Sequence, residues 1–241
     1  MFSTSSRGRL TARDLARFPD DTLFHRIARA TCRAGCLPRK ELYEAWEMAR
    51  RVRRRFRGGR VVDLGGGHGL LAQLMLLLDD SSPGAVVVDK ALPRSSAALH
   101  DAQIQVWPRL TGRVAFVAAS LDEVDILAAD LVVSSHACGA LTDRVLERAV
   151  AARARVAVLP CCHDLTACPE LPLAWRRADA NNHSRELSGW VDGALAIDIG
   201  RAVRLQQKGY RIWTQAIPVE ITPKNRLLLA APPEFDPKLV S

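Results

Sequence analysis

The sequence has no long apolar run. Its longest apolar stretches lie around residues 70–78 and 155–160, far short of the roughly 20 residues that cross a bilayer. The first residues carry serine and arginine but lead into a charged segment without an apolar core, so a secretion signal is not expected. We therefore expect no membrane contact and a cytoplasmic location.

Lysine is scarce and arginine is abundant. Of the 34 basic residues only 5 are lysine, and the formal net charge is +8. Such a surplus favours anionic partners, nucleic acid first among them, although an arginine bias also fits a GC-rich genome. Hydrophobic residues make up 48% and charged residues 25%, which excludes disordered and fibrous classes. Six cysteines, two of them adjacent, are read as thiols, metal ligands or core residues rather than a disulfide framework.

The spacing of apolar residues predicts two helices before residue 60. Asp20 and Asp21 are expected to cap the first helix. A glycine and a proline between residues 35 and 38 then break the pattern. The second helix carries apolar residues on one face and arginines on the rest, until the glycines at 58–59 end it. We expect residues 1–59 to be an N-terminal helical extension of a domain that begins at residue 60.

From residue 60 onward, short β-branched runs alternate with helical stretches, a pattern typical of βαβ units and a parallel sheet. The last two strands are joined by a short segment with two prolines, so they should form an antiparallel hairpin. The expected strands are 60–64, 85–89, 115–118, 131–134, 156–159, 210–217 and 226–230, with helices after the first five. This arrangement predicts an α/β, Rossmann-like class I methyltransferase fold with a seven-stranded mixed sheet over residues 60–241.

A glycine-rich loop follows the first expected strand and runs directly into an apolar helical stretch. Glycines let the backbone adopt unusual dihedral angles and let a ligand approach where a Cβ would collide. The helix after the loop offers free N–H groups and the positive end of its dipole. The loop is Asp63-Leu64-Gly65-Gly66-Gly67-His68-Gly69. We expect Gly65, Gly67, His68 and Gly69 to contact a nucleoside cofactor.

The loop and its neighbouring acids favour S-adenosylmethionine over a nicotinamide dinucleotide, whose glycines would be spaced for a pyrophosphate. Asp63 puts a carboxylate where it can meet the amino group of methionine. Asp89, at the end of the second strand, is expected to accept both ribose hydroxyls. Asp122, or the backbone beside it, is expected to address the adenine amino group, and Ser135 is assigned to the same cofactor site.

Two further strand ends carry histidines and cysteines. His136 and Cys138 follow the fourth strand, and Cys161, Cys162 and His163 follow the fifth. The carboxyl ends of parallel strands meet at one edge of a sheet, so these side chains should share a catalytic crevice. A histidine could take a proton, a thiolate could act as nucleophile, or several groups could hold a soft metal such as zinc. Small buried core cysteines are the alternative, and the sequence does not choose.

These loops resemble a known family. The segments His136-Ala137-Cys138-Gly139-Ala140-Leu141-Thr142-Asp143, Pro160-Cys161-Cys162-His163-Asp164 and Ile221-Thr222-Pro223-Lys224-Asn225-Arg226 are similar to those of the methyltransferase-like domain family that includes the glutathione S-transferase C-terminal-domain-containing protein. More distantly, they resemble the tRNA acceptor-stem ribose methyltransferases. The resemblance covers residues 38–232. It implies a methyltransferase fold, S-adenosylmethionine and, through the tRNA enzymes, an RNA acceptor.

An RNA nucleoside is the first expectation for the acceptor. Arginines near the end of the second helix are expected to neutralise phosphates, and such contacts position RNA without reading its sequence. Trp175, Trp190 and Trp213 are candidates for base stacking, although the position of Trp213 inside the expected hairpin favours the core for it. The arginines are Arg50, Arg51, Arg53, Arg54, Arg55 and Arg57. A solvated helix face is the alternative interpretation of this segment.

Two other functions stay open on the sequence. One is a methyltransferase for a small molecule, thiol or metalloid, in which Cys161 and Cys162 hold the acceptor directly or through a metal. The other is a non-catalytic cofactor-binding partner protein with a structural metal site. Asp164, directly after His163, could orient that imidazole. The sequence leaves the oligomeric state open.

Overall fold

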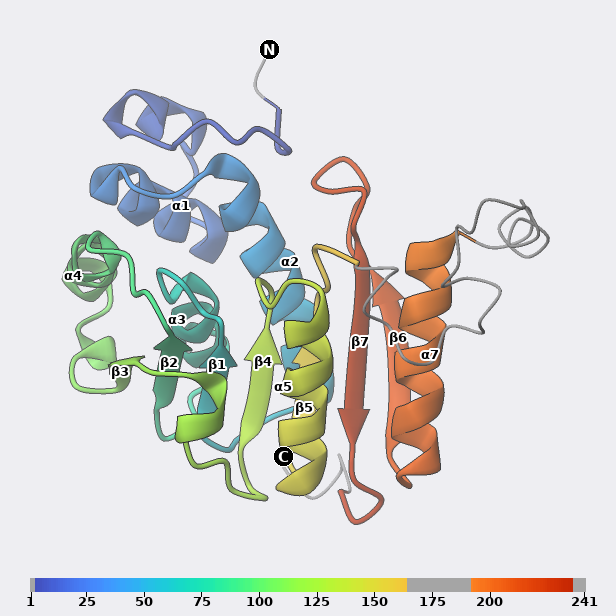
Figure 1. The fold of residues 1–241 in the computed structure, drawn as a ribbon. Coiled ribbons are helices and arrows are strands. Elements are labelled where there is room, and N and C mark those ends of the chain that lie inside the picture. Colours follow the sequence, from blue (N-terminus) through green and yellow to red (C-terminus); the bar gives the residue numbers. More distant parts are fainter. Residues whose placement is uncertain (1–2, 164–191, 236–241) are drawn as a thin grey trace.

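A seven-stranded sheet forms the centre of the molecule in the computed structural model, which describes residues 3–163 and 192–235 (Figure 1). The strand order is β3-β2-β1-β4-β5-β7-β6. The strands are β1 (Val61–Leu64), β2 (Ala85–Asp89), β3 (Val114–Ala118), β4 (Leu131–Ser134), β5 (Arg155–Val158), β6 (Arg211–Ala216) and β7 (Arg226–Ala231). Strands β1 to β5 are parallel, and β7 runs antiparallel to both β5 and β6. The expected fold, including the terminal hairpin, is confirmed.

Helices cover both faces of this sheet because its strands are apolar on both sides. Val61 packs into one hydrophobic core and its neighbour Val62 into the other, and both are fully buried. The first face carries α1 (Leu23–Ala34), α2 (Arg39–Arg55), α3 (Leu70–Leu77) and α4 (Ser96–Val106), and the second carries α5 (Ala140–Ala151) and α7 (Gly193–Gln207). Among the described residues, short 3-10 helices also form at Ala12–Arg17, Pro108–Leu110 and Leu121–Glu123.

The start of α1 differs from the prediction. Thr22, not Asp20 or Asp21, is the N-cap, and its hydroxyl accepts a hydrogen bond from the backbone N–H of His25 at 3.2 Å. Asp21 lies at 3.2 Å from the guanidinium of Arg29 instead. The predicted break after α1 is present, because Gly35 adopts a left-handed conformation with φ of 66°.

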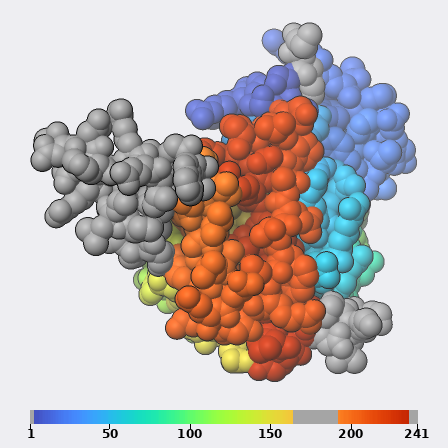
Figure 2. All heavy atoms as spheres, turned by 90° about the vertical axis from the view of Figure 1, so that its right-hand side faces the viewer, coloured from blue at the N-terminus to red at the C-terminus, as the bar shows by residue number. Residues whose placement is uncertain are grey.

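The N-terminal helices share the core of the sheet. Leu42, Met48, Val52 and Phe56 are fully buried in the same cluster as α3 and α4. The Phe56 ring packs edge-on against Trp213 of β6, which is half-buried rather than fully in the core. Figure 2 shows that α7, β6 and β7 form one side of the molecule, with the blue N-terminal residues at one end of it. No helix among the described residues is long and apolar enough to span a bilayer.

Candidate active site

The loop between β1 and α3 has the backbone that its glycines predict. Gly67 has φ of 51°, a value that other residues rarely adopt. Gly66 is needed for a different reason, since a Cβ there would lie 2.8 Å from the carboxyl carbon of Asp63 and 2.8 Å from a methyl group of Val87. The sequence pattern does not predict a special role for Gly66. The role follows from the packing of β1 and β2 beneath the loop, which leaves no space for a side chain at this position.

Asp63 lies under this loop with its carboxylate fully buried. Neither carboxylate oxygen has a hydrogen-bond partner. Burial, with a smaller contribution from the nearby Asp89, raises the pKa of Asp63 to about 7, while the backbone N–H of Ala72 opposes the shift without reaching hydrogen-bond geometry. An orphaned buried carboxylate of this kind indicates a cationic or hydrogen-bonding ligand group.

The other acids of the expected cofactor site make contacts of their own. Asp89 accepts hydrogen bonds from the backbone N–H groups of Gly67 and Ala91, both at 3.1 Å, so it holds the glycine loop against the end of β2. Asp122 is half-exposed and accepts a 2.8 Å hydrogen bond from Arg144 of α5. The ribose role of Asp89 and the adenine role of Asp122 stay predictions.

A cavity of about 140 Å³ separates the glycine loop from α2. His68, Ser135 and His136, which the sequence assigned to the cofactor and catalytic sites, line it. His68 also contacts the Ser95 hydroxyl at 2.9 Å, and burial lowers its pKa. Glu41, in the first turn of α2, also lines the cavity. Burial raises the pKa of Glu41, and the neighbouring His136 opposes that shift.

Glu41 is a site residue that the sequence patterns do not reveal. It precedes the glycine loop by more than twenty residues. The sequence predicts its helix only as part of an N-terminal extension, without a role in the site. The packing of α2 against α3 brings it to the cavity. No motif in the sequence signals this contact.

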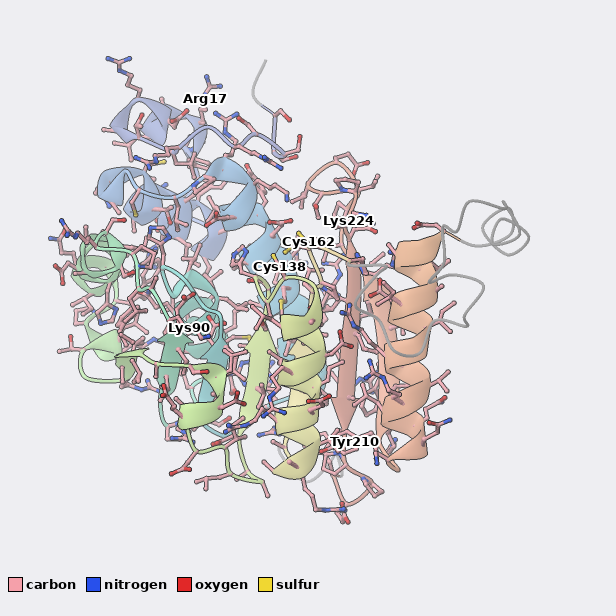
Figure 3. All side chains as sticks on the ribbon, viewed as in Figure 1. Arg17, Lys90, Cys138, Cys162, Tyr210 and Lys224 are labelled. Carbon is pink, nitrogen blue, oxygen red and sulfur yellow. The ribbon has the colours of Figure 1, made fainter. Side chains whose placement is uncertain are left out.

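Three thiols meet where β4 and β5 end. The Sγ atoms of Cys138 and Cys161 are 2.9 Å apart, those of Cys161 and Cys162 are 3.8 Å apart, and all three lie within 4.8 Å of one another. Figure 3 shows Cys138 and Cys162 side by side at this edge, and both are exposed. Burial, followed by the neighbouring thiols, raises the pKa of Cys161 far above its usual range. Cys32 and Cys36 are buried core residues instead.

His163 does not join the thiols. Its Nε2 atom lies 2.8 Å from the carboxylate of Asp198 on α7, and its Nδ1 atom is buried without a partner. Arg226 of β7 donates to the same carboxylate at 2.6 Å. Burial opposes ionisation of Asp198, but the hydrogen bonds from His163 and Arg226 hold its pKa below the usual value. In this arrangement His163 anchors the β5 loop, and its catalytic role stays a prediction.

Arg201, also on α7, anchors the second loop. Its side chain is 1% exposed and donates to the carbonyl of Gly139 at 3.0 Å and to Asp143 at 2.7 Å. Asp198 and Arg201 are one helical turn apart and together position both thiol-bearing loops. They lie 35 and 62 residues from their partners His163 and Gly139, so sequence spacing does not reveal them.

The arginines near the end of α2 lie toward the opposite rim of the sheet. Arg53 donates to the carbonyl of Met75 near the end of α3, and the backbone carbonyl of Arg57 accepts from Arg155 at the start of β5. With a rise of about 1.5 Å per residue, Arg53 lies roughly 18 Å along the helix from Glu41. This placement does not support the expectation that the segment guides RNA into the crevice.

Most of these arginines also have internal partners. Arg53 is 2% exposed and pairs with Asp79 at 2.9 Å, which corrects its assignment as a phosphate ligand. Arg50 and Arg51 pair with Glu47. The remaining three differ in their surroundings: Arg55 lies 4.8 Å over the Trp213 ring, Arg57 donates to the carbonyl of Leu78, and Arg54 is exposed. Asp164, Trp175 and Trp190 lie outside the described residues.

Comparisons with known proteins agree with this fold. The sequence profile of a family described as "Methyltransferase domain" matches residues 40–168, more than half of the chain. The chain is 26% identical to the glutathione S-transferase C-terminal domain-containing protein of Xenopus laevis over 42% of its own length. It spans only 20% of that relative. This relative was anticipated by the resemblance of the thiol and histidine loops.

Two solved structures illustrate the likeness in fold. An O-methyltransferase family protein from Burkholderia thailandensis has a TM-score of 0.50 and 18% identity, with 94% of this chain and 64% of that chain covered. The 23S rRNA methyltransferase ErmE has a TM-score of 0.48 and 13% identity, with 79% of this chain and 67% of that one covered. The likeness to the O-methyltransferase family protein concerns the fold alone.

The family implies S-adenosylmethionine, and the residues at the glycine loop fit it. Asp63 offers an unsatisfied carboxylate, and Gly66 has no space for a side chain. The cavity beside them is lined by Gly67, His68 and Ser135. These residues would hold the cofactor, whose electrophilic methyl group is the chemistry it supplies. The chain therefore belongs to the methyltransferase domain family and has the class I methyltransferase fold.

Proposed function

We propose that the chain methylates the sulfur of a small thiol-bearing acceptor. The observation that carries this proposal is the cluster of Cys138, Cys161 and Cys162 at the carboxyl ends of β4 and β5. Ligands of open α/β sheets bind beyond the carboxyl ends of the strands, and the glycine loop after β1 lies at the same edge. The sulfur of the acceptor could contact these thiols directly, or it could bind a soft cation that the thiols also bind.

A second cavity fits an acceptor of small size. It has a volume of about 450 Å³ and lies between α7 and the β6–β7 hairpin. Pro160, the residue before Cys161, is one of its lining residues. Small-molecule sites commonly have volumes of roughly 300–1,000 Å³, apolar walls and a few polar groups. Leu195, Ile199 and Leu228 supply apolar wall here, and Asp198 and Arg226 supply charge.

The chain's own residues must hold the acceptor sulfur and accept its proton. His136 and Glu41 line the cavity beside the glycine loop and are candidate proton acceptors. Methyl transfer to sulfur leaves the electron pair of the broken bond on the donor sulfur and releases the acceptor proton. Burial raises the pKa of Glu41 above its ordinary value, which makes its carboxylate a stronger proton acceptor.

Labelled cofactor tests the proposal directly. Purified chain is incubated with methyl-tritiated S-adenosylmethionine and with 2-mercaptoethanol, cysteine or thiophenol, and the tritium in the thioether product is counted. We expect label in at least one thioether, loss of most of it in Cys162→Ser, and full activity in Cys36→Ser, whose thiol lies in the helical core. No label in any thiol, with cofactor binding intact, would reject a thiol acceptor.

An RNA nucleoside is the second candidate, because the net charge of +8 favours a polyanion. A pool of tRNA and rRNA is offered in the same assay, with binding measured at 50 and 200 mM salt. RNA recognised through several phosphates should bind at least about a hundredfold more weakly at the higher salt. Tritium in RNA together with this salt dependence would replace the thiol proposal.

A further inference from the structure

The spacing of the three thiols at the β4–β5 edge is close to that of sulfur ligands on one metal ion. Zinc–sulfur bonds of about 2.3 Å at tetrahedral angles place two sulfurs roughly 3.8 Å apart. Cys161 and Cys162 are already 3.8 Å apart, and Cys138 lies 2.9 Å from Cys161. An opening of about 1 Å at the exposed Cys138 side chain would give the Cys138–Cys161 pair the same separation, and all three sulfurs already lie within 4.8 Å of one another.

The donor set selects the kind of cation. Three sulfurs are soft ligands that favour zinc and related ions over magnesium or calcium, which prefer oxygen. Helix α5 begins at Ala140, two residues after Cys138, and the positive end of its dipole favours thiolates there. The backbone N–H of Gly139 donates to the carbonyl of Cys162 at 3.3 Å, so the two ligand-bearing loops are joined to each other.

We infer that Cys138, Cys161 and Cys162 bind one thiophilic divalent cation of the zinc class and leave its fourth coordination position open. Among the residues that the structure describes, no imidazole or carboxylate shares the cluster. Closed structural zinc sites use four protein ligands, whereas catalytic sites keep three and an exchangeable position. Because Cys138 and Cys162 face solvent, an external ligand can reach that position.

The surrounding residues preorganise this site. Arg201 holds the Gly139 carbonyl beside Cys138, and Asp198 holds His163 beside Cys162. Supports of this kind orient metal ligands. The metal site itself does not depend on the identity of the acceptor. In the proposed function the acceptor sulfur would occupy the open position, and this one assignment rests on that proposal.

Cobalt titration tests the site without any activity measurement. Co²⁺ is added to the reduced full-length chain in the absence of cofactor, and the thiolate-to-cobalt absorption in the near ultraviolet is followed. We expect saturation at one equivalent, displacement by Zn²⁺, and affinity reduced at least about tenfold in Cys138→Ser, Cys161→Ser and Cys162→Ser. Cys36→Ser is the matched control and should bind like the unchanged chain.

The open position has its own readout. Adding 2-mercaptoethanol to the cobalt-loaded chain should shift the visible cobalt bands, because a fourth thiolate replaces solvent. Unshifted bands would overturn the open position. Absence of the near-ultraviolet band, or equal affinity in the three variants with unchanged circular dichroism, would overturn the whole site. A chain that binds cobalt but methylates no thiol would retain the metal site and reject the proposed acceptor.

Discussion

The buried carboxylate of Asp63 makes the free protein sensitive to pH. Its pKa is about 7 in the folded chain, against an ordinary value near 4 in the unfolded chain. The folded chain therefore keeps a proton that the unfolded chain loses, and stability falls as the pH rises from about 4 to about 7. The difference amounts to about 4 kcal/mol.

Asp63→Asn should remove this component of the pH dependence. The free energy of unfolding, measured by urea denaturation at several pH values between 4 and 8 without cofactor, should decline less for the variant. Asp101→Asn, on the exposed surface of α4, is the control and should keep the original slope. Equal slopes for Asp63→Asn and the unchanged chain would show that the carboxylate is hydrogen-bonded or solvated.

The same residue should control cofactor affinity. An asparagine keeps the shape of Asp63 but loses the charge that can meet an ammonium group, and hydrogen bonds to charged groups contribute about 1.5–3 kcal/mol. We expect Asp63→Asn to raise the Kd for S-adenosylmethionine about tenfold to a hundredfold in isothermal titration calorimetry. Unaltered affinity would contradict the assignment of Asp63 to the cofactor site.

At the scale of elements, an ion pair fastens α2 to the end of α3. Arg53 and Asp79 are 2% and 5% exposed and lie 2.9 Å apart, and Arg53 also donates to Ser82 at 2.8 Å. Burial lowers the pKa of Arg53 to about 10, so it is still charged at neutral pH. A segment expected to bind RNA thus contributes to the packing of helices.

Removing that pair from one side should destabilise the protein. Arg53→Met leaves a buried carboxylate without its buried ion-pair partner, which costs about 3–5 kcal/mol. Arg54→Met, at the next position but exposed, should change stability by less than about 0.5 kcal/mol. Thermal unfolding of both variants checks this contrast, and equal melting temperatures would argue against a structural role for Arg53.

At the scale of the whole molecule, the N-terminal helices and the sheet form one core. The buried faces of α1 and α2 include Ile27, Leu42 and Met48, all with no exposed surface. A chain that starts at residue 60 would leave the apolar surface beneath these helices open to water. The sequence pattern changes between residues 59 and 60, but we expect that the two parts on either side of this boundary do not fold independently.

Truncation tests this expectation. We expect the fragment 60–235 to be insoluble or to lose its cooperative thermal transition, while the same fragment preceded by residues 3–59 keeps it. Circular dichroism melts of the two chains measure the difference. A cooperative transition in the shorter fragment would show that the sheet folds without α1 and α2.

Local patterns determined the parts of the structure that depend on local physics. Short β-branched runs alternating with helical stretches predicted all seven strands within one or two residues, because central strands that are buried on both faces are mostly apolar. Glycine spacing predicted the loop after β1. Parallel topology then predicted that Cys138 and Cys161 would share one edge, since successive strands present their carboxyl ends together.

Contacts between distant segments were decided only by the tertiary structure. Whether an arginine binds RNA or fills an internal ion pair depends on what packs beside it, and Asp79 lies 26 positions from Arg53 in the chain. Glu41 at the cavity and Asp198 beside His163 are brought into place by helix packing. Such residues do not recur at a regular spacing in the sequence. Their roles depend on a contact with a residue that is distant in the chain, and the sequence alone does not identify that residue.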